Sequence, residues 1–547
     1  MNYLRLYLFL KWQISAIFIL LNLSLIGIKP ALSQANQLHK NYILSSDNFF
    51  RSRFQPLLIT QEASNESYEI KTITVIGSRI FTAADFAPII NPVQEETVSR
   101  QQLLAVVQAI TKLYLDSGYL TSRAVLVEDS LNTGNITIQV LEGKLSAIEI
   151  EGTERLNPEY ARSRLELANQ PVLNVTQLED QLRLLRSNPL LDTVEASLKA
   201  GENIQESILV VKVQEADPWI IDISLDNYSP PSVGSEEATL SIGHRNLTGN
   251  GDTIQASYSR TIQGGAEEID LNYNLPINAK NGMISLRTAF GRNEVIEDEF
   301  EDFNIEGDFD LVELNYRQPL IRNSREEFAL SLGFAYQNGE TFLLGEPTPF
   351  SVGPDDDGIS RTSIIKLGQD YIRRSESGAW GLRSQFNFGT RLFDATDNNG
   401  DIPDGQFISW LGQIQRVQIL SPDNLLIIQA DIQLSSDELL SSQQFVIGGG
   451  QSLRGYRQNI LAGDQGIQIS IEDQITLSRN DAGEPIFKLA PFFDLGTVIN
   501  KDDNPNQIAQ DKTVIAGLGL GLLWTPTTDL NIRLDYGIPL VDLDDGG

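Results

Sequence analysis

A glycine-rich stretch near the C-terminal end, GGGQSLRGYRQNILAGDQG (448–466), carries the residues best suited to a specific charged interaction. It holds Arg454 within a region that otherwise reads as β-strand. Two later carboxylates, Glu472 and Asp494, alternate with apolar neighbours and so face inward. If the stretch folds back, Arg454 can form a two-pronged ion pair with Asp494, with Glu472 as a second candidate, while glycine lets the backbone pack closely. An external loop with solvated arginines is the alternative, and spacing alone leaves both open.

Other reaction chemistry has few residues to work with. The chain contains no cysteine, which excludes disulfides and thiolate catalysis. It has two histidines, His39 and His244, and each is isolated in the sequence. A Ser/His/Asp triad or a histidine metal site is therefore not expected, and no catalytic residue, metal or cofactor is assigned. The formal charge of −32 repels nucleic acid, so a nucleic-acid partner is not expected.

The elements that must position the loop are strands, because alternation replaces helical spacing from Trp219 onward. In TIQASYSRTI, Ile254 and Tyr258 share one face, while Gln255 and Ser257 share the other. Short turns such as SPDN and TPTT alternate with long acidic loops such as NEVIEDEFEDFN and DATDNNGDIPDG. A soluble sandwich has no reason to sort its loops this way, whereas an outer-membrane barrel does. About fifteen strands are predicted, centred near residues 222, 241, 258, 271, 286, 312, 331, 365, 385, 412, 428, 471, 493, 519 and 534.

One predicted strand, GLGLGLLW (517–524), has glycine on alternate positions. Its spacing is wrong for a dinucleotide loop, and no helix follows. As a strand it turns leucine toward lipid and Gly517, Gly519 and Gly521 toward the interior. A glycine strip on an inner wall leaves room for another segment to pack there.

Residues 69–215 read as a doubled unit. Each copy opens with a strand, YEIKTITVIGS or SAIEIEGTERL, continues as an amphipathic helix, and closes with a second strand. The motif I-x-V/I-x-G recurs at 73–77 and 148–152. Two β-α-β units in tandem are therefore predicted, with one larger α/β domain as the alternative.

The N-terminus has Arg5 and Lys11, an apolar run over 12–28, and small residues around Ala31 and Ser33. This pattern predicts a signal peptide over residues 1–35, because the run is shorter than the roughly 20 residues of a membrane-spanning helix. A retained anchor is the alternative. Residues 36–68 are polar and are predicted to form a linker with room for a short helix.

The glycine-rich stretch resembles the loop of the two-partner secretion transporters, of the haemolysin-activator and filamentous-haemagglutinin transporter type. Leu453, Arg454, Gly455 and Tyr456 match the family's V-R-G-Y with leucine for valine. PFFDLG resembles its F-x-D-x-G, on Phe492, Asp494 and Gly496, and DNYSPPSVGSEEATLSIGHRNLTGNGD resembles its first barrel hairpin. The doubled unit is similar to its two POTRA domains.

The resemblance implies a first POTRA domain at 69–143, a second at 144–216, and a sixteen-strand outer-membrane barrel at 217–547 with a conserved loop at 446–464. It further implies that the periplasmic POTRA domains bind an unfolded exoprotein, which carries an N-terminal secretion domain, by strand addition. The exoprotein would then cross through the barrel. Arg454 would be the loop-tip arginine and Asp494 its partner on the wall. A monomer in contact with outer-membrane lipid is expected.

The resemblance leaves two questions about the chain as written. It stops at VDLDDGG just after the fifteenth predicted strand, so the closing strand is expected to be missing. Two rival functions also remain. A β-barrel assembly factor shares the arginine motif but usually carries more POTRA units. A passive solute pore would need neither POTRA units nor an inward arginine loop.

Overall fold

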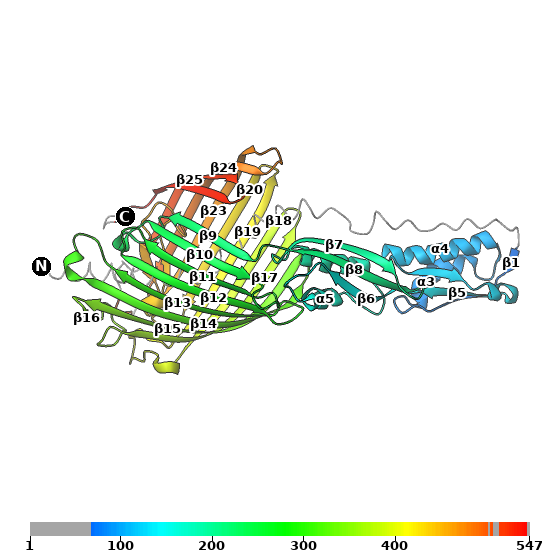
Figure 1. Ribbon diagram of the computed structural model, residues 1–547, viewed down its shortest axis with the longest axis horizontal. Coiled ribbons are helices and arrows are strands. Elements are labelled where there is room, and N and C mark those ends of the chain that lie inside the picture. Colours follow the sequence, from blue (N-terminus) through cyan, green and yellow to red (C-terminus); the bar gives the residue numbers. More distant parts are fainter. Residues whose placement is uncertain (1–66, 502–503, 507–512, 544–547) are drawn as a thin grey trace. The chain divides into compact units, whose positions relative to one another are not determined.

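The computed structural model describes residues 67–501, 504–506 and 513–543 (Figure 1). The predicted signal peptide and all but the last two residues of the predicted linker lie outside these ranges. Contacts divide the described chain into two compact units. One consists of residues 67–217 with 249–251, and the other of 218–248 with 252–543.

The first unit begins with a three-stranded sheet in the order β2-β5-β4, in which β2 runs parallel to β5. Two helices connect the strands, and β1 pairs with β3 in a separate two-stranded ribbon. Leu103, Val106, Ile110 and Tyr114 recur at helical spacing on α4 and are buried against the sheet. The elements are β1(Ser67–Glu69), β2(Thr72–Ile76), α3(Ala83–Ile90), β3(Thr97–Ser99), α4(Arg100–Asp116), β4(Arg123–Leu126) and β5(Asn135–Leu141).

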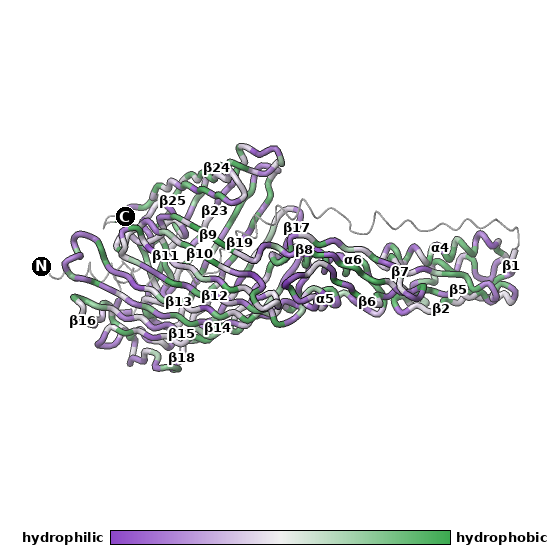
Figure 2. The backbone as a smooth tube through the Cα atoms, in the orientation of Figure 1, coloured by the Kyte–Doolittle hydropathy of each residue, from purple (hydrophilic) through white to green (hydrophobic). Residues whose placement is uncertain are grey.

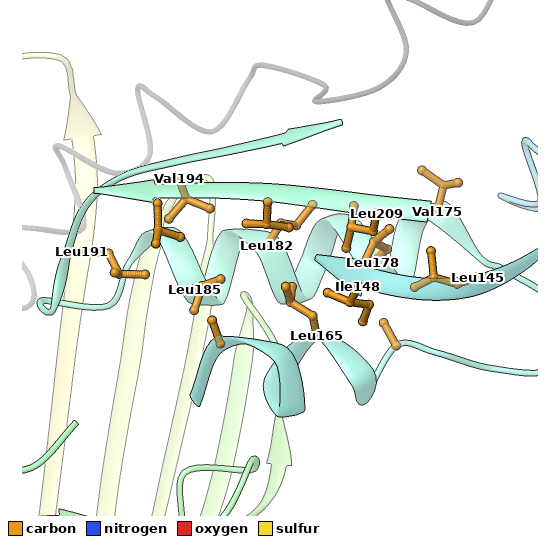
Figure 3. Packing of buried hydrophobic residues seen from close by; sticks show 14 of the residues in the cluster. Leu145, Ile148, Leu165, Val175, Leu178, Leu182, Leu185, Leu191, Val194 and Leu209 are labelled. Carbon is orange, nitrogen blue, oxygen red and sulfur yellow. The ribbon is translucent and has the colours of Figure 1, made fainter. Parts of the chain in front are cut away.

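The next segment repeats the order strand, two helices, two strands, and its sheet runs β6-β8-β7 with β6 parallel to β8. Figure 3 shows Leu182 and Leu185 of α6 packed between this sheet and Leu165 of α5. Each fully buried leucine contributes about 1.5–3 kcal/mol to folding. The elements are β6(Lys144–Glu151), α5(Pro158–Glu166), α6(Val175–Arg186), β7(Leu191–Ala200) and β8(Glu206–Glu215).

A glutamate lies at the end of the last strand of each copy, Glu142 directly after β5 and Glu215 as the final residue of β8. It holds the loop that follows β2 or β6. Glu142 accepts hydrogen bonds from the backbone N–H groups of residues 79 and 80, and Glu215 from those of residues 154–156. Burial alone would raise the pKa of Glu215, but these three donors and Arg155 outweigh it and lower the pKa. The same loop turns at Gly77 (φ 82°) in one copy and Gly152 (φ 88°) in the other. A Cβ there would collide with the carbonyl oxygen of Val140 or Val213, each two residues before its glutamate.

The prediction of one helix per copy was incomplete, because α3 and α5 also form. Both are short, and α3 contains Pro88 while α5 buries only Ala161 and Leu165. Two turns with so few apolar residues leave little periodicity to detect. Among the residues that the structure describes, no helix is long and apolar enough to cross a membrane.

The second unit is one large antiparallel sheet, and all fifteen predicted strands are present in chain order. The two-residue strand β16(Glu346–Pro347) adds to the edge of β15 beyond its β17 pairing. The strands are β9(Trp219–Asp226), β10(Glu237–Arg245), β11(Thr253–Thr261), β12(Ala266–Pro276), β13(Met283–Glu294), β14(Ile305–Arg322), β15(Glu326–Leu343), β17(Ser360–Ser375), β18(Gly378–Thr390), β19(Ile408–Ser421), β20(Asn424–Ser435), β23(Gln465–Arg479), β24(Pro485–Ile499), β25(Thr513–Thr527) and β26(Leu530–Pro539).

The two faces of this sheet differ in polarity along each strand, as Figure 2 shows by its alternating colours. On β11, Ile254 and Tyr258 are exposed, whereas Gln255 and Ser257 are half-buried on the other face. On β25, Leu518, Leu520 and Leu522 are likewise exposed. An exposed apolar face and a polar inner face are those of a transmembrane barrel.

The sheet curls so that its first and last strands approach one another. Within the described ranges, β9 and β26 each pair with a single strand. Tyr228, directly after β9, nevertheless lies within electrostatic range of Arg533 and Asp535 on β26. The inner face is therefore enclosed by both ends of the sheet.

Candidate functional site

The glycine-rich loop between β20 and β23 begins and ends as a small ribbon. β21(Phe445–Ile447) pairs antiparallel with β22(Leu461–Gly463). An apolar cluster surrounds this ribbon and joins the loop to β24 and β25. Its buried members are Phe445, Ile447, Leu453, Tyr456, Ile460, Leu461, Val498 and Ile515.

The tip of the loop is shaped by three glycines with positive φ, at 118° for Gly448, 90° for Gly449 and 101° for Gly455. Such angles are readily adopted only by glycine. The hydroxyl of Ser452 both accepts from the N–H of Gly448 and donates to its carbonyl, each at 2.9 Å. The tip is therefore a compact turn that presents Arg454 to the wall.

The structure brings Arg454 and Asp494 together in a buried fork. Nε donates to Oδ2 of Asp494 at 2.8 Å, and Nη2 donates to Oδ1 at 2.9 Å. The backbone N–H of Arg454 also donates to Oδ2 at 3.0 Å. Asp494 is 0% exposed and Arg454 is 7% exposed. Planar, two-pronged pairing of this kind suits arginine and not lysine.

Glu472 is the second carboxylate on Arg454, which donates to it from Nη1 at 2.7 Å. It is shared with Arg533, whose Nη2 donates to the same oxygen at 2.6 Å. Arg533 also pairs with Asp535 at 2.7 Å. The cluster thus holds two guanidinium groups and three carboxylates, and it links the loop to β23, β24 and β26.

An aromatic ring and a glycine floor complete the site. The Cζ atom of Arg454 lies 3.5 Å from the ring centre of Phe492, a cation–π contact. A Cβ on Gly517 would collide with the carbonyl oxygen of Arg454, and one on Gly537 would lie 2.5 Å from the N atom of Gly455. Of the three inner glycines predicted to leave room for a packed segment, Gly517 lies against this loop. A Cβ on Gly519 or Gly521 would instead meet residues of the barrel wall.

The remaining loop residues anchor it to the end of the sheet. Leu453 is fully buried, and its side chain lies beside Gly496, where an added Cβ would be 3.1 Å away. Tyr456 places its hydroxyl 2.9 Å from the carbonyl oxygens of Ala516 and Val541. Glycine at 496 thus gives the space that Leu453 needs.

The structure places the sequence-predicted residues Leu453, Arg454, Gly455 and Tyr456 against Phe492, Asp494, Gly496 and Glu472. Arg457, the other arginine of the stretch, is exposed and takes no part in this cluster. Sequence reasoning missed Arg533 and Asp535. Their alternation with Ile532 and Leu534 already placed them on the inner face and was the available signal.

The site can hold a loop against the inner wall, because its charged groups pair with one another. Every described cluster member is a hydrogen-bond or ion-pair partner of another. The loop is held on the inner wall by charge-assisted contacts that water or a polypeptide could replace.

Two family models match the chain. Residues 205–523 match the family described as haemolysin secretion/activation protein ShlB/FhaC/HecB, and residues 68–143 match the ShlB-type POTRA domain. Outer membrane transporter CdiB of Dickeya dadantii is 24% identical over 67% of this chain and 65% of its own length. The chain thus spans just under two thirds of that relative. Heme/hemopexin transporter protein HuxB of Haemophilus influenzae is 22% identical over 81% of this chain and 78% of its own.

Solved structures agree in fold. CdiB from Escherichia coli superposes with a TM-score of 0.70 at 22% identity, over 95% of this chain and 96% of that one. BamA from Haemophilus ducreyi without its first three POTRA domains gives 0.53 at 15% identity, over 87% and 97%. The first family match covers more than half of the 547 residues. The chain therefore belongs to the ShlB/FhaC/HecB family of haemolysin secretion/activation proteins.

Proposed function

We propose that this chain binds an unfolded exoprotein in the periplasm and passes it along the polar inner face of its barrel to the cell surface. The observation that carries the proposal is the Arg454 loop, docked on the inner wall by the fork to Asp494. A passive pore gains nothing from a buried, multiply bonded loop in its interior. A transporter that must seal and open its interior has a use for one.

Residues 69–143 and 144–216 serve in this proposal as two POTRA domains, ahead of the barrel at 217–547. The assignment of residues 144–216 as a POTRA domain is supported by the repeated order of its elements. It is also supported by the shared loop structure, in which a glycine turn is held by a glutamate, Gly77 with Glu142 and Gly152 with Glu215. Among the described residues, each three-stranded sheet has two edge strands that pair on one side only, β2 and β4 in one sheet and β6 and β7 in the other. Such edges can accept an extended segment by strand addition.

The partner in this proposal is a secreted exoprotein with an N-terminal secretion domain, and the transporter acts as a monomer in outer-membrane lipid. The docked loop closes the interior at rest, and the exoprotein displaces it. Leu453, Arg454, Gly455 and Tyr456 are the moving residues, and Asp494 and Glu472 are their fixed partners. The proposal assigns no catalytic step.

Deletion of the gene in its native cells tests this function. Loss from the medium of one large secreted protein, restored by the wild-type chain, is the expected result. Complementation with Arg454→Ala should restore barrel insertion but only weak secretion, whereas the exposed-loop control Arg457→Ala should restore both. A general loss of outer-membrane proteins would instead identify an assembly factor. Unchanged secretion with reduced solute uptake would identify a passive pore.

A further inference from the structure

A groove of about 330 Å³ lies on the outer, apolar face of the sheet, over β15, β17, β18 and β19. Its walls include Tyr371, Leu382 and Ile414, which are register neighbours on β17, β18 and β19. The same face carries exposed Leu367 and Phe386 close by. The groove therefore opens toward lipid and not toward the interior.

Small residues beside the Tyr371, Leu382 and Ile414 row leave room for this groove. In the next row of paired residues, Ser384 lies opposite Gly412. The indole of Trp410 folds across that row, with Nε1 donating to the hydroxyl of Ser384 at 3.0 Å. A Cβ on Gly412 would lie 2.6 Å from the Trp410 ring, so any larger residue there would push the indole out of the groove wall that it forms. The cavity is thus specified by particular residues and is not a gap between strands.

The mouth of the groove lies at the periplasmic membrane interface. Residue 217 ends the periplasmic unit, so β9 starts at the periplasmic rim, where the short connections also lie. Trp219, Trp380 and Trp524 are exposed and each lies within three residues of a strand end at that rim. Aromatic residues form such girdles at the headgroup level of barrels.

Two arginines flank Trp380 at this height. Arg373 and Arg416 are its register partners on β17 and β19 and therefore share its outward face. The Cζ atom of Arg416 lies 5.1 Å from the ring centre of Trp380. Within the described part of the chain, neither arginine has a carboxylate within ion-pair distance. Glu326, opposite Arg373, instead accepts from the hydroxyl of Tyr371 at 2.9 Å.

We infer that this groove is a binding site for one glycerophospholipid of the periplasmic leaflet. Its anionic phosphate lies between Arg373 and Arg416, and an acyl chain follows the groove past Tyr371 and Leu382. Two guanidinium groups beside a lipid phase attract anionic headgroups. The phosphate supplies the charge partner that the described residues lack, and the groove walled by Tyr371, Leu382 and Trp410 supplies contact area for the chain.

Native mass spectrometry of the detergent-purified full chain tests this site. The probes are phosphatidylglycerol and phosphatidylcholine added at equal concentration. Wild-type protein should retain one phosphatidylglycerol at least tenfold better than phosphatidylcholine. The double variant Arg373→Gln/Arg416→Gln should lose that preference, and Gly412→Leu should lose retention of the lipid. The matched control Arg292→Gln removes an exposed outward arginine at the external rim and should behave as wild type.

Heat-modifiable gel migration shows which variants fold. If the double arginine variant does not fold, Gly412→Leu and the wild-type lipid preference decide the question. Quenching of tryptophan fluorescence by brominated phosphatidylglycerol is an independent readout. Measured in a Trp219→Phe/Trp524→Phe background, which keeps Trp380 and Trp410 beside the groove, it should fall in Gly412→Leu. Equal retention of both lipids by the wild type, or unchanged retention and quenching in Gly412→Leu, would overturn the inference.

Discussion

Replacing Arg454 by lysine separates charge from geometry at the loop. The arginine side chain donates four hydrogen bonds, two to Asp494, one to Glu472 and one to Ser470. Lysine keeps the charge but cannot form the fork or stack its plane on Phe492. Loss of one charge-assisted hydrogen bond costs about 1.5–3 kcal/mol, so the undocked population should rise about 10- to 100-fold.

Arg454→Ala should have a larger effect, because it leaves a fully buried Asp494 and a shared Glu472 without their loop partner. Removing one member of a buried pair costs about 3–5 kcal/mol, or roughly two to three orders of magnitude in the undocked population. The substitution should weaken docking of the loop but should not affect assembly of the barrel. Heat-modifiable gel migration should therefore be unchanged.

Because the chain contains no cysteine, an introduced thiol is the only site for maleimide labelling. Leu453→Cys places one thiol at a position that is 0% exposed while the loop is docked. The rate of maleimide labelling then reports the undocked fraction when docking is fast. We expect labelling to rise from the Arg454 parent through Arg454→Lys to Arg454→Ala. Labelling of Arg454→Lys at the parental rate, or an equal rise in the exposed-arginine control Arg457→Lys, would refute the reasoning.

Three further predictions follow from the packing. Gly517→Val should expel the loop and raise Leu453→Cys labelling as Arg454→Ala does, whereas the outward neighbour change Leu518→Val should not. Gly152→Ala should lower the melting temperature of a fragment of residues 67–217, since its φ of 88° strains any other residue and its Cβ meets a carbonyl. Because the pKa of Glu215 is lowered in the folded state, its ionised carboxylate stabilises the fold at pH values above the ordinary pKa of glutamate. This stabilisation is lost as the pH falls through the pKa of Glu215 in the folded protein. Glu215→Gln should therefore flatten the decline in fragment stability as the pH falls below the ordinary pKa of glutamate.

Each of these has an outcome that contradicts it. Wild-type labelling in Gly517→Val would mean that the loop does not need the glycine floor. An unchanged melting temperature in Gly152→Ala would show that the close approach to Val213 does not require glycine at this position. If fragment stability declines with falling pH as steeply in Glu215→Gln as in the wild type, other carboxyl groups cause the acid sensitivity.

The strands were predictable because alternation is a strong signal over their whole length. Ile254 and Gln255, for example, fall on opposite faces in the structure as the pattern requires. The short helices α3 and α5 were not predictable, because each offers about two turns and few buried residues. Burial in the second copy depends on contacts such as Leu165 with α6, which local sequence does not contain.

Docking of the loop could be stated from sequence only as one of two alternatives. The residue types of Arg454 and Asp494 allow the fork, but their meeting depends on the register of β23 with β24, which brings Ser470 opposite Asp494. The participation of Arg533 depends on curling of the sheet. The lipid-facing groove is less accessible still, because it arises from the register of three strands and the rotamer of Trp410.

The measurement that tests transport most directly is photo-crosslinking from the wall of the barrel in native cells. A photoreactive residue at Gln413 faces the interior, and one at the neighbouring Ile414 faces lipid. We expect position 413 to capture one large secreted polypeptide in transit and position 414 to capture none. Capture of no polypeptide at 413, or of the same one at both positions, would contradict passage through the interior.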